Sequence, residues 1–202
     1  MKKAFVLVTI LFVSIISTAC INNFAVQELN DKAKTYLDKG DFENAISRLK
    51  SSVDLDSSIF ETHYNLGIAY TQAEKFPEAV ETFTNAIKLR PEFADAFYSL
   101  GVAQENYAKG IIDGSIKNKK TNDQIEDDTE KVKDLEEEAK PIKLTKEDKT
   151  KIAELFNNSI TSYETYLEKG KEITDKEEVE KKIEYLKEQI EKYSGEKSKS
   201  AE

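Results

Sequence analysis

The chain has 202 residues, of which 30 are Lys or Arg and 39 are Asp or Glu, so its formal net charge at pH 7 is −9. An acidic chain lacks the positive field that attracts phosphate backbones and anionic headgroups, which argues against nucleic acid and anionic lipid as ligands. Because Cys20 is the single cysteine, no internal disulfide can form, and the packing of helices or strands has to supply the stability.

The N-terminus has the three parts of an export signal. Two lysines precede an apolar run over residues 4–16, and three small residues then lead to Cys20. The first 19 residues, 1–19, are therefore predicted to be a secretory signal peptide. Small residues before a cysteine resemble the bacterial lipoprotein cleavage box, with Ser17 where that box usually has leucine. This resemblance implies that Cys20 becomes the lipid-modified first residue.

A lipid-modified Cys20 would anchor the protein to a bacterial membrane, because two or more acyl chains hold a protein stably. Residues 20–25 form only an anchor and a short linker, so the domain would stay at the surface, facing the periplasm or the exterior. Ile21 follows the cysteine, which favours the outer membrane if the organism is Gram-negative. The alternative is an uncleaved N-terminal signal anchor, since residues 4–21 approach the length of a short membrane span.

A period of 34 residues marks the middle of the chain. Gly67 in segment 60–93 recurs as Gly101, and Tyr64 recurs as Tyr98. A period of this length indicates stacked helix pairs. Segment 60–93 resembles a tetratricopeptide repeat, whose signature positions are held here by His63, Leu66, Gly67, Tyr70, Ala79, Phe83, Ala86 and Pro91.

Packing arguments agree with this resemblance. Leu66 and Tyr70 are four residues apart and share one face of the first helix of the segment. Gly67 has no side chain, so the second helix, which carries Phe83, can approach closely. Pro91 then ends the pair and begins the turn to the next one. Segment 60–93 is therefore predicted to form two packed helices.

The other two copies depart from the pattern. In the first copy, 26–59, Ala33 replaces the glycine and Leu49 the aromatic residue, as expected of a degenerate terminal repeat. The third copy begins normally over residues 94–110. Its second helix would then need a small residue and an aromatic, but those positions are Asp113 and Lys117.

The missing helix is predicted at residues 151–169, which contain a small–large–large pattern made by Ser159, Tyr163 and Tyr166. Residues 111–150 would then be an insertion within the third repeat. Its charged sequence carries one apolar stripe, made by Ile125, Val132, Leu135, Ala139 and Ile142. Thr145 and Asp148 resemble a capping box that opens the following helix. The stripe predicts a projecting helical hairpin, and the alternative is a charged loop.

Residues 174–194 keep an alternation of four and three in their apolar positions and predict a C-terminal capping helix, followed by a loose tail, 195–202. The resemblance implies an all-α fold, a tetratricopeptide α-solenoid of about three helix pairs. The third pair is interrupted by the charged helical insertion, and the capping helix closes the stack.

The resemblance also implies a binding groove, because the first helices of such repeats line a concave face. The residues placed there are Asn30, Lys34, Tyr64, Asn65, Ile68, Tyr98, Ser99 and Val102, and the same face continues to Glu105. Tyrosine buries much area at a low entropy cost, which suits the capture of a peptide or helix. The alternative is that Tyr64 and Tyr98 only pack against neighbouring helices. Asp95 and Ser99 stand where a clamp for a chaperone's C-terminal carboxylate would need basic residues.

Nothing in the sequence indicates an enzyme, a metal site, a cofactor or a small-molecule substrate. His63, the single histidine, occupies an aromatic packing position of the repeat, and no phosphate loop or nucleophile motif is found. The hypothesis is therefore a membrane-anchored protein–protein interaction adaptor or scaffold of the bacterial cell envelope, which binds a peptide or helix of another envelope protein. The alternative is a self-associating structural envelope protein that uses the insertion and the C-terminal helix.

Overall fold

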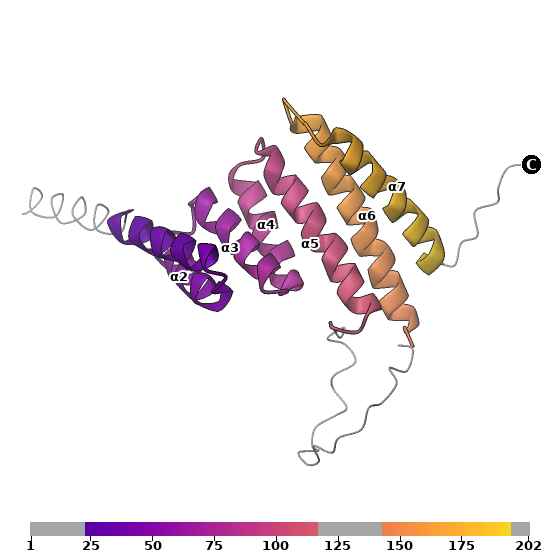
Figure 1. Ribbon diagram of the computed structural model, residues 1–202, viewed down its shortest axis with the longest axis horizontal. Helices are drawn as coiled ribbons and strands as arrows, with labels where there is room; N and C mark the ends of the chain where they lie inside the picture. The colour runs from indigo at the N-terminus through magenta and orange to yellow at the C-terminus, as the bar shows by residue number, and fades with distance from the viewer. Residues whose placement is uncertain (1–22, 117–142, 195–202) are drawn as a thin grey trace, which may run out of the picture. The chain divides into compact units, whose positions relative to one another are not determined.

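The structure, a computed structural model, describes residues 23–116 and 143–194, and all regular secondary structure within these ranges is helical (Figure 1). Residues 23–38 form the first helix. The others are α2 (Phe42–Leu55), α3 (Phe60–Gln72), α4 (Phe76–Leu89), α5 (Ala94–Ile112), α6 (Lys146–Lys169) and α7 (Lys176–Ser194). The predicted all-α class is confirmed. The chain divides after Ala96 into two compact units.

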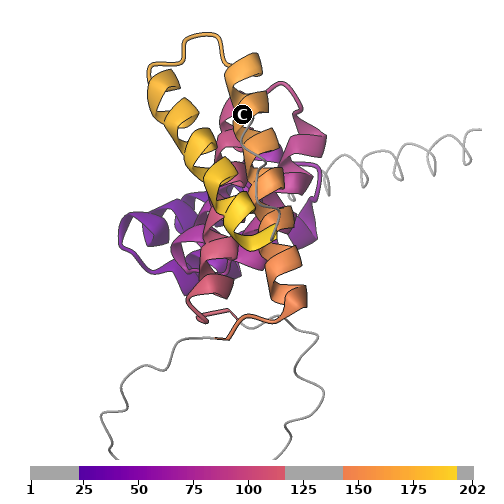
Figure 2. The ribbon, with the colours of Figure 1, turned by 90° about the vertical axis from the view of Figure 1, so that its right-hand side faces the viewer.

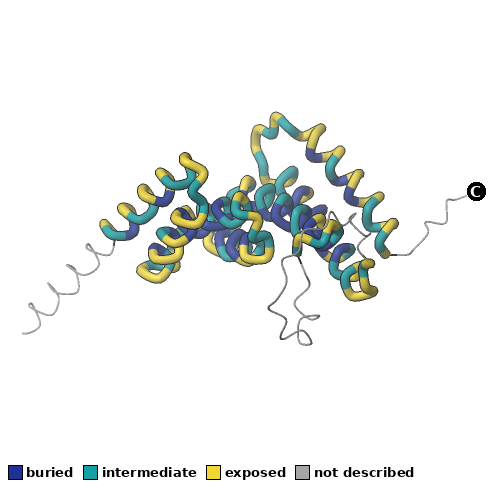
Figure 3. Tube along the Cα trace, turned by 60° about the horizontal axis from the view of Figure 1, so that its bottom comes forward, coloured by how far each residue is buried: buried dark blue, intermediate teal, exposed yellow. Residues whose placement is uncertain are grey.

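The first unit holds the helix over 23–38 and α2 to α4. One part of its core consists of Ala33, Ala45, Ile46, Leu49, Leu66 and Ala69. Ala33 and Leu49, which stand where the repeat pattern has glycine and an aromatic, are both fully buried. The degenerate first copy therefore packs as a repeat, with smaller side chains at the two variable positions. Buried positions recur at helical spacing along each element (Figure 3).

Gly67 lets α4 approach α3, as the sequence predicts. A Cβ atom on Gly67 would lie 2.6–2.8 Å from three atoms of the Phe83 ring, which is closer than such atoms can pack. Ala79 and Ala86, one turn before and after Phe83 on α4, are fully buried. Large and small side chains thus interdigitate between the two helices.

The second unit repeats this packing between α5 and α6. A Cβ atom on Gly101 would lie 2.8 Å from the ring of Tyr163, which is fully buried. The hydroxyl of Ser159 donates a 2.8 Å hydrogen bond to the backbone oxygen of Gly101. Residues of α6 therefore provide the second helix of a third pair, and the predicted arrangement of three pairs and a C-terminal helix is confirmed.

The start of α6 and the packing of α7 both follow local signals in the sequence. The capping box at the start of α6 is confirmed, because the Thr145 hydroxyl accepts from the amide of Asp148 while the Asp148 carboxylate accepts from the amide of Thr145. α7 runs alongside α6 and buries the residues Val179, Ile183 and Leu186, as its apolar spacing predicts (Figure 2).

Several predictions lie outside the described residues: the signal peptide, Cys20, the stripe of the insertion over 117–142, and the tail. Residues 23–25, which were expected to belong to a linker, already form helix. Similarly, α6 begins at Lys146, inside the segment expected to be insertion. Among the described helices, none has the length and hydropathy needed to cross a membrane.

Candidate protein-interaction surface

Tyr64, the central residue of the predicted groove, belongs to an aromatic cluster of the first unit. Its ring stacks on Phe60 with a centroid distance of 5.7 Å and meets the edges of Phe83 and Phe93 at 5.9 and 5.4 Å. The residue is nevertheless only half-buried. Tyr64 therefore packs against neighbouring aromatic rings, and part of its surface remains exposed to solvent. Its role as a packing residue is confirmed, and its role in binding a partner stays a prediction.

Asn30 does not turn its amide nitrogen toward a groove. The nitrogen donates to the backbone oxygen of Val26 at 2.9 Å and to the hydroxyls of Ser52 and Thr62 at 2.9 and 3.0 Å. Both hydroxyl residues are fully buried. Asn30 thus ties the first helix to α2 and α3. The prediction that its amide nitrogen faces a ligand in the groove is therefore wrong.

The remaining predicted residues of the first unit lie nearer the solvent. Lys34 is exposed, one helical turn beyond Asn30, while Asn65 and Ile68 on α3 are half-buried. Asn65 and Ile68 are three residues apart, so they share a face of α3. Since Asn30 contacts Thr62, the first helix lies next to α3.

In the second unit, Tyr98 packs against α6. Its ring centroid lies 5.6 Å from that of Tyr163 and 5.2 Å from that of Tyr166. Burial, together with negative charges that include Asp175, raises the pKa of Tyr98. Val102 packs on the core of this unit, and Ser99 is half-buried. A common groove formed by Tyr98 and the α3 residues stays a prediction.

Glu105, expected on the same face as Tyr98, is instead a buried structural carboxylate. It is 5% exposed and accepts hydrogen bonds from the Tyr163 hydroxyl at 2.8 Å and from the Lys109 ammonium at 2.5 Å. Lys182 of α7 lies 4.0 Å away. Burial opposes ionisation, but these hydrogen bonds and positive charges outweigh it, and the pKa of Glu105 lies below its ordinary value. The carboxylate thereby connects α5, α6 and α7.

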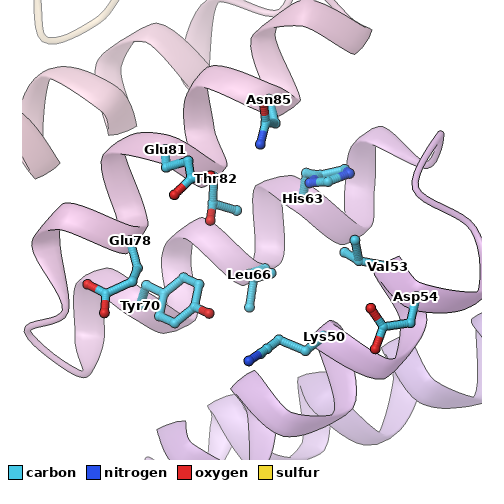
Figure 4. Close-up of a pocket in the computed structure, with 10 residues that line it drawn as sticks. All are labelled: Lys50, Val53, Asp54, His63, Leu66, Tyr70, Glu78, Glu81, Thr82 and Asn85. Carbon is cyan, nitrogen blue, oxygen red and sulfur yellow. The ribbon is translucent and has the colours of Figure 1, made fainter.

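A cleft on the other side of α3 was not predicted. It has a volume of about 210 Å³ and lies between α2 and α4, with α3 as its floor (Figure 4). Its lining residues are Lys50, Val53, Asp54, His63, Leu66, Tyr70, Glu78, Glu81, Thr82 and Asn85. No sequence signal marks it, because charged residues on the second helices of repeats are typical of a solvated face.

His63 occupies the packing position that the repeat pattern indicates. It is 8% exposed, and its Nε2 atom lies 2.9 Å from the backbone oxygen of Ser57. Within residues 23–116 and 143–194, no group of three His, Cys, Asp or Glu side chains is placed to hold a metal ion.

Comparisons with known proteins agree on the repeat. The family described as TPR repeat matches residues 33–73 and 69–106. The second TPR domain of human RPAP3, solved in complex with the HSP70 peptide SGPTIEEVD, is 16% identical with a TM-score of 0.54, covering 82% of this chain and 98% of that one. The TPR domain of Arabidopsis OM64 is 11% identical with a TM-score of 0.55, covering 84% of this chain and 99% of that one.

A third solved structure, the first TPR domain of Spaghetti (RPAP3) bound to the HSP90 peptide SRMEEVD, is 15% identical with a TM-score of 0.54, covering 82% of this chain and 92% of that one. No curated protein matches the sequence closely enough to count as a relative. At these identities the likeness concerns the fold alone. The sequence match identifies tetratricopeptide repeats over residues 33–106, and the described residues have the fold of a tetratricopeptide stack, with three helix pairs followed by a C-terminal helix.

Proposed function

We propose that this protein is a membrane-anchored adaptor of the bacterial cell envelope, which binds a peptide or helix of a partner protein on the first-helix face of its repeats. The observation that carries the proposal is the tetratricopeptide stack itself, in which Asn65 and Ile68 are half-buried on one face of α3. Domains of this fold hold peptides in the human RPAP3 and Spaghetti complexes. A binding function therefore fits the fold better than catalysis does.

The partner segment differs in chemistry from the acidic peptides of those complexes. Asp95 is exposed and Ser99 is a neutral hydroxyl residue, and both stand where a carboxylate clamp would need a cation. The face instead offers the half-buried Tyr64 and Ile68 of α3, and Lys34 is exposed on the first helix. We infer a segment that inserts an apolar side chain and offers polar groups around it.

Attachment through Cys20 completes the proposal. The signal-like segment 1–19 supports export, and lipidation of Cys20 would hold the repeats at a membrane surface facing the periplasm or exterior, the outer membrane if the organism is Gram-negative. Phe24, near the start of the described chain, is 69% exposed. An aromatic ring so close to an acyl anchor suits the interface between lipid and water.

Site-specific photo-crosslinking in cells tests the binding face. A photoreactive residue is placed at Ile68, and a matched control is placed at Asn158, which is exposed on α6 of the other unit. A discrete adduct at Ile68 that is missing at Asn158 would support the proposal and identify the partner. Adducts with a second copy of the chain would favour a self-associating envelope protein, and identical adducts at both positions would contradict a specific face.

A further inference from the structure

The cleft between α2 and α4 has the size of one side chain. Its volume of about 210 Å³ lies below the roughly 300–1,000 Å³ of pockets that enclose small-molecule ligands. Leu66 lies on its floor, Lys50 and Asp54 project from α2 on one side, and Glu81 lies on α4 on the opposite side (Figure 4). A second hollow of about 530 Å³ adjoins it along α2 and shares Lys50 and Asp54. A partner chain could therefore run along α2 and insert one side chain.

The charged residues of the cleft are mostly acidic. Asp54, Glu78 and Glu81 stand against a single cation, Lys50. Across the described part of the chain, no ion pair includes any of these three carboxylates. The nearby cation Lys75 is already paired with Glu43 at 2.8 Å. The cleft consequently has unpaired negative charge for a cationic ligand.

The carboxylates Glu78 and Glu81 of the cleft also act on Tyr70. Burial is the first cause that raises the pKa of its hydroxyl, and the negative charges of Glu78, Glu81 and Glu43 raise it further against the opposing charge of Lys75. Burial disfavours the anionic form of the ring without any field, and the neighbouring carboxylates add to that effect. The ring itself also lines the cleft, and an aromatic face there can receive a cation.

His63 adds an acceptor at the buried side of the cleft. The backbone oxygen of Ser57 can only accept, so Nε2 of His63 must carry the proton of their 2.9 Å hydrogen bond. In the neutral ring, Nδ1 then has a lone pair. Among the described residues Nδ1 has no hydrogen-bond partner, and the atom itself is not fully enclosed, so a ligand in the cleft can reach it. A ligand with N–H donors would satisfy it.

We propose that this cleft binds an arginine side chain of a partner protein. A guanidinium carries five N–H donors in a planar fork, which can pair with one carboxylate of the cleft in a bidentate manner, and it stacks on an aromatic ring better than an ammonium does. The surface belongs to α2 and α4 and is separate from the first-helix face. The assignment therefore stands or falls independently of the proposed peptide site there.

The single histidine makes the test direct, because its imidazole resonances need no assignment. The full chain labelled with ¹⁵N is titrated with N-acetyl-arginine-N-methylamide while the His63 Nδ1 resonance is recorded by NMR. A saturable shift is expected. N-acetyl-citrulline-N-methylamide, the uncharged analogue of the same shape, is expected to give none. Equal shifts with both probes, no shift with either, or equally tight binding of the corresponding lysine derivative would overturn the proposal.

Two variants locate the binding. Asp54→Asn and Glu81→Gln each remove one negative charge from an exposed side chain, and each is expected to weaken arginine binding about fivefold, the effect of one exposed ion pair. Glu188→Gln on the exposed face of α7 is the matched control and is expected to bind as the wild type does. Lys50→Gln is expected to tighten binding, because it removes the cation that shares the cleft. Unchanged affinity in both carboxylate variants would overturn the assignment.

Discussion

Ser159 donates a hydrogen bond of 2.8 Å to the backbone oxygen of Gly101, although 58 residues separate the two in the sequence. The ring of Tyr163, one turn further along α6, covers the same glycine. Phe83 covers Gly67 in the same manner in the preceding pair. The second and third helix pairs are therefore held together by the same kind of contact, an aromatic ring over a glycine. In the second pair the two helices are adjacent in sequence, whereas in the third pair they are far apart in sequence.

Replacing Gly101 with Ala tests this contact. The new Cβ atom would lie 2.8 Å from the Tyr163 ring, which is fully buried and cannot swing into solvent. Overpacking costs about 1–3 kcal/mol, and the better helix propensity of alanine returns about 1 kcal/mol, so we expect a net loss of up to ~2 kcal/mol in the free energy of unfolding. Urea denaturation followed by circular dichroism measures it. Glu164→Ala at an exposed position of α6 should change stability by less than ~0.5 kcal/mol.

The lowered pKa of Glu105 predicts that the free energy of unfolding decreases at acidic pH. Its pKa is lowered in the folded protein, so its contribution is fully present above the ordinary value of 4.5 and is lost as the pH falls through the folded-state pKa. Glu105→Gln keeps an acceptor for Tyr163 but loses the attraction to Lys109 and Lys182. We expect the variant to be ~2 kcal/mol less stable at pH 7. The difference from the wild type should shrink below pH 4.5, and a difference that is constant with pH would contradict a role for the charge.

Thr145→Ala removes the N-cap of α6. The hydroxyl accepts from the amide of Asp148 at 3.1 Å, and losing such a cap costs about 1 kcal/mol. Thermal and urea unfolding should both show the loss. Thr150→Ala, at an exposed position one turn into the same helix, serves as the control and should have a much smaller effect. Equal destabilisation by the two variants would mean that the cap contributes nothing specific.

Ile68→Asp should abolish partner capture without unfolding the repeats. Ile68 is half-buried on α3, and an ionised carboxylate there would have to be desolvated by any apolar side chain that packs on this face. With the photoreactive residue moved to Asn65, the adduct seen in the unmodified background should disappear. Lys34→Gln removes one positive charge but introduces no carboxylate, and it should reduce the yield of the adduct only in part. An adduct that survives Ile68→Asp would place the partner elsewhere.

Cys20→Ser should abolish lipid attachment. If Cys20 is the acylated residue, cells fed an alkyne-labelled fatty acid should label the wild-type protein, and the variant should carry no label. Ser17→Ala, which keeps a small residue before the cysteine, should be labelled normally. The wild type could instead carry no label, keep its N-terminal segment and still associate with the membrane. That result would favour the signal anchor.

The local signals in the sequence were sufficient for much of the fold. The capping box at Thr145 and Asp148 depends on residues three apart, and the pairing of Gly67 with Phe83 depends on a repeat whose period is visible in the sequence. Such features are recognisable because a helix end or a close approach between helices needs particular residue types at a fixed spacing. The displaced second helix at Tyr163 could be found for the same reason.

The directions of the polar side chains were decided only by tertiary packing. The sequence placed Asn30 and Glu105 on a binding face, but Asn30 donates into the interior and Glu105 is enclosed by three helices. Helical periodicity fixes which face a residue is on, whereas the neighbouring helix decides whether that face meets solvent, a hydroxyl or an ammonium. The arginine-sized cleft beside His63 has the same origin. The cleft forms because α2 and α4 are separated from each other on one side of α3. That separation depends on how three helices pack and cannot be predicted from any single segment of the sequence.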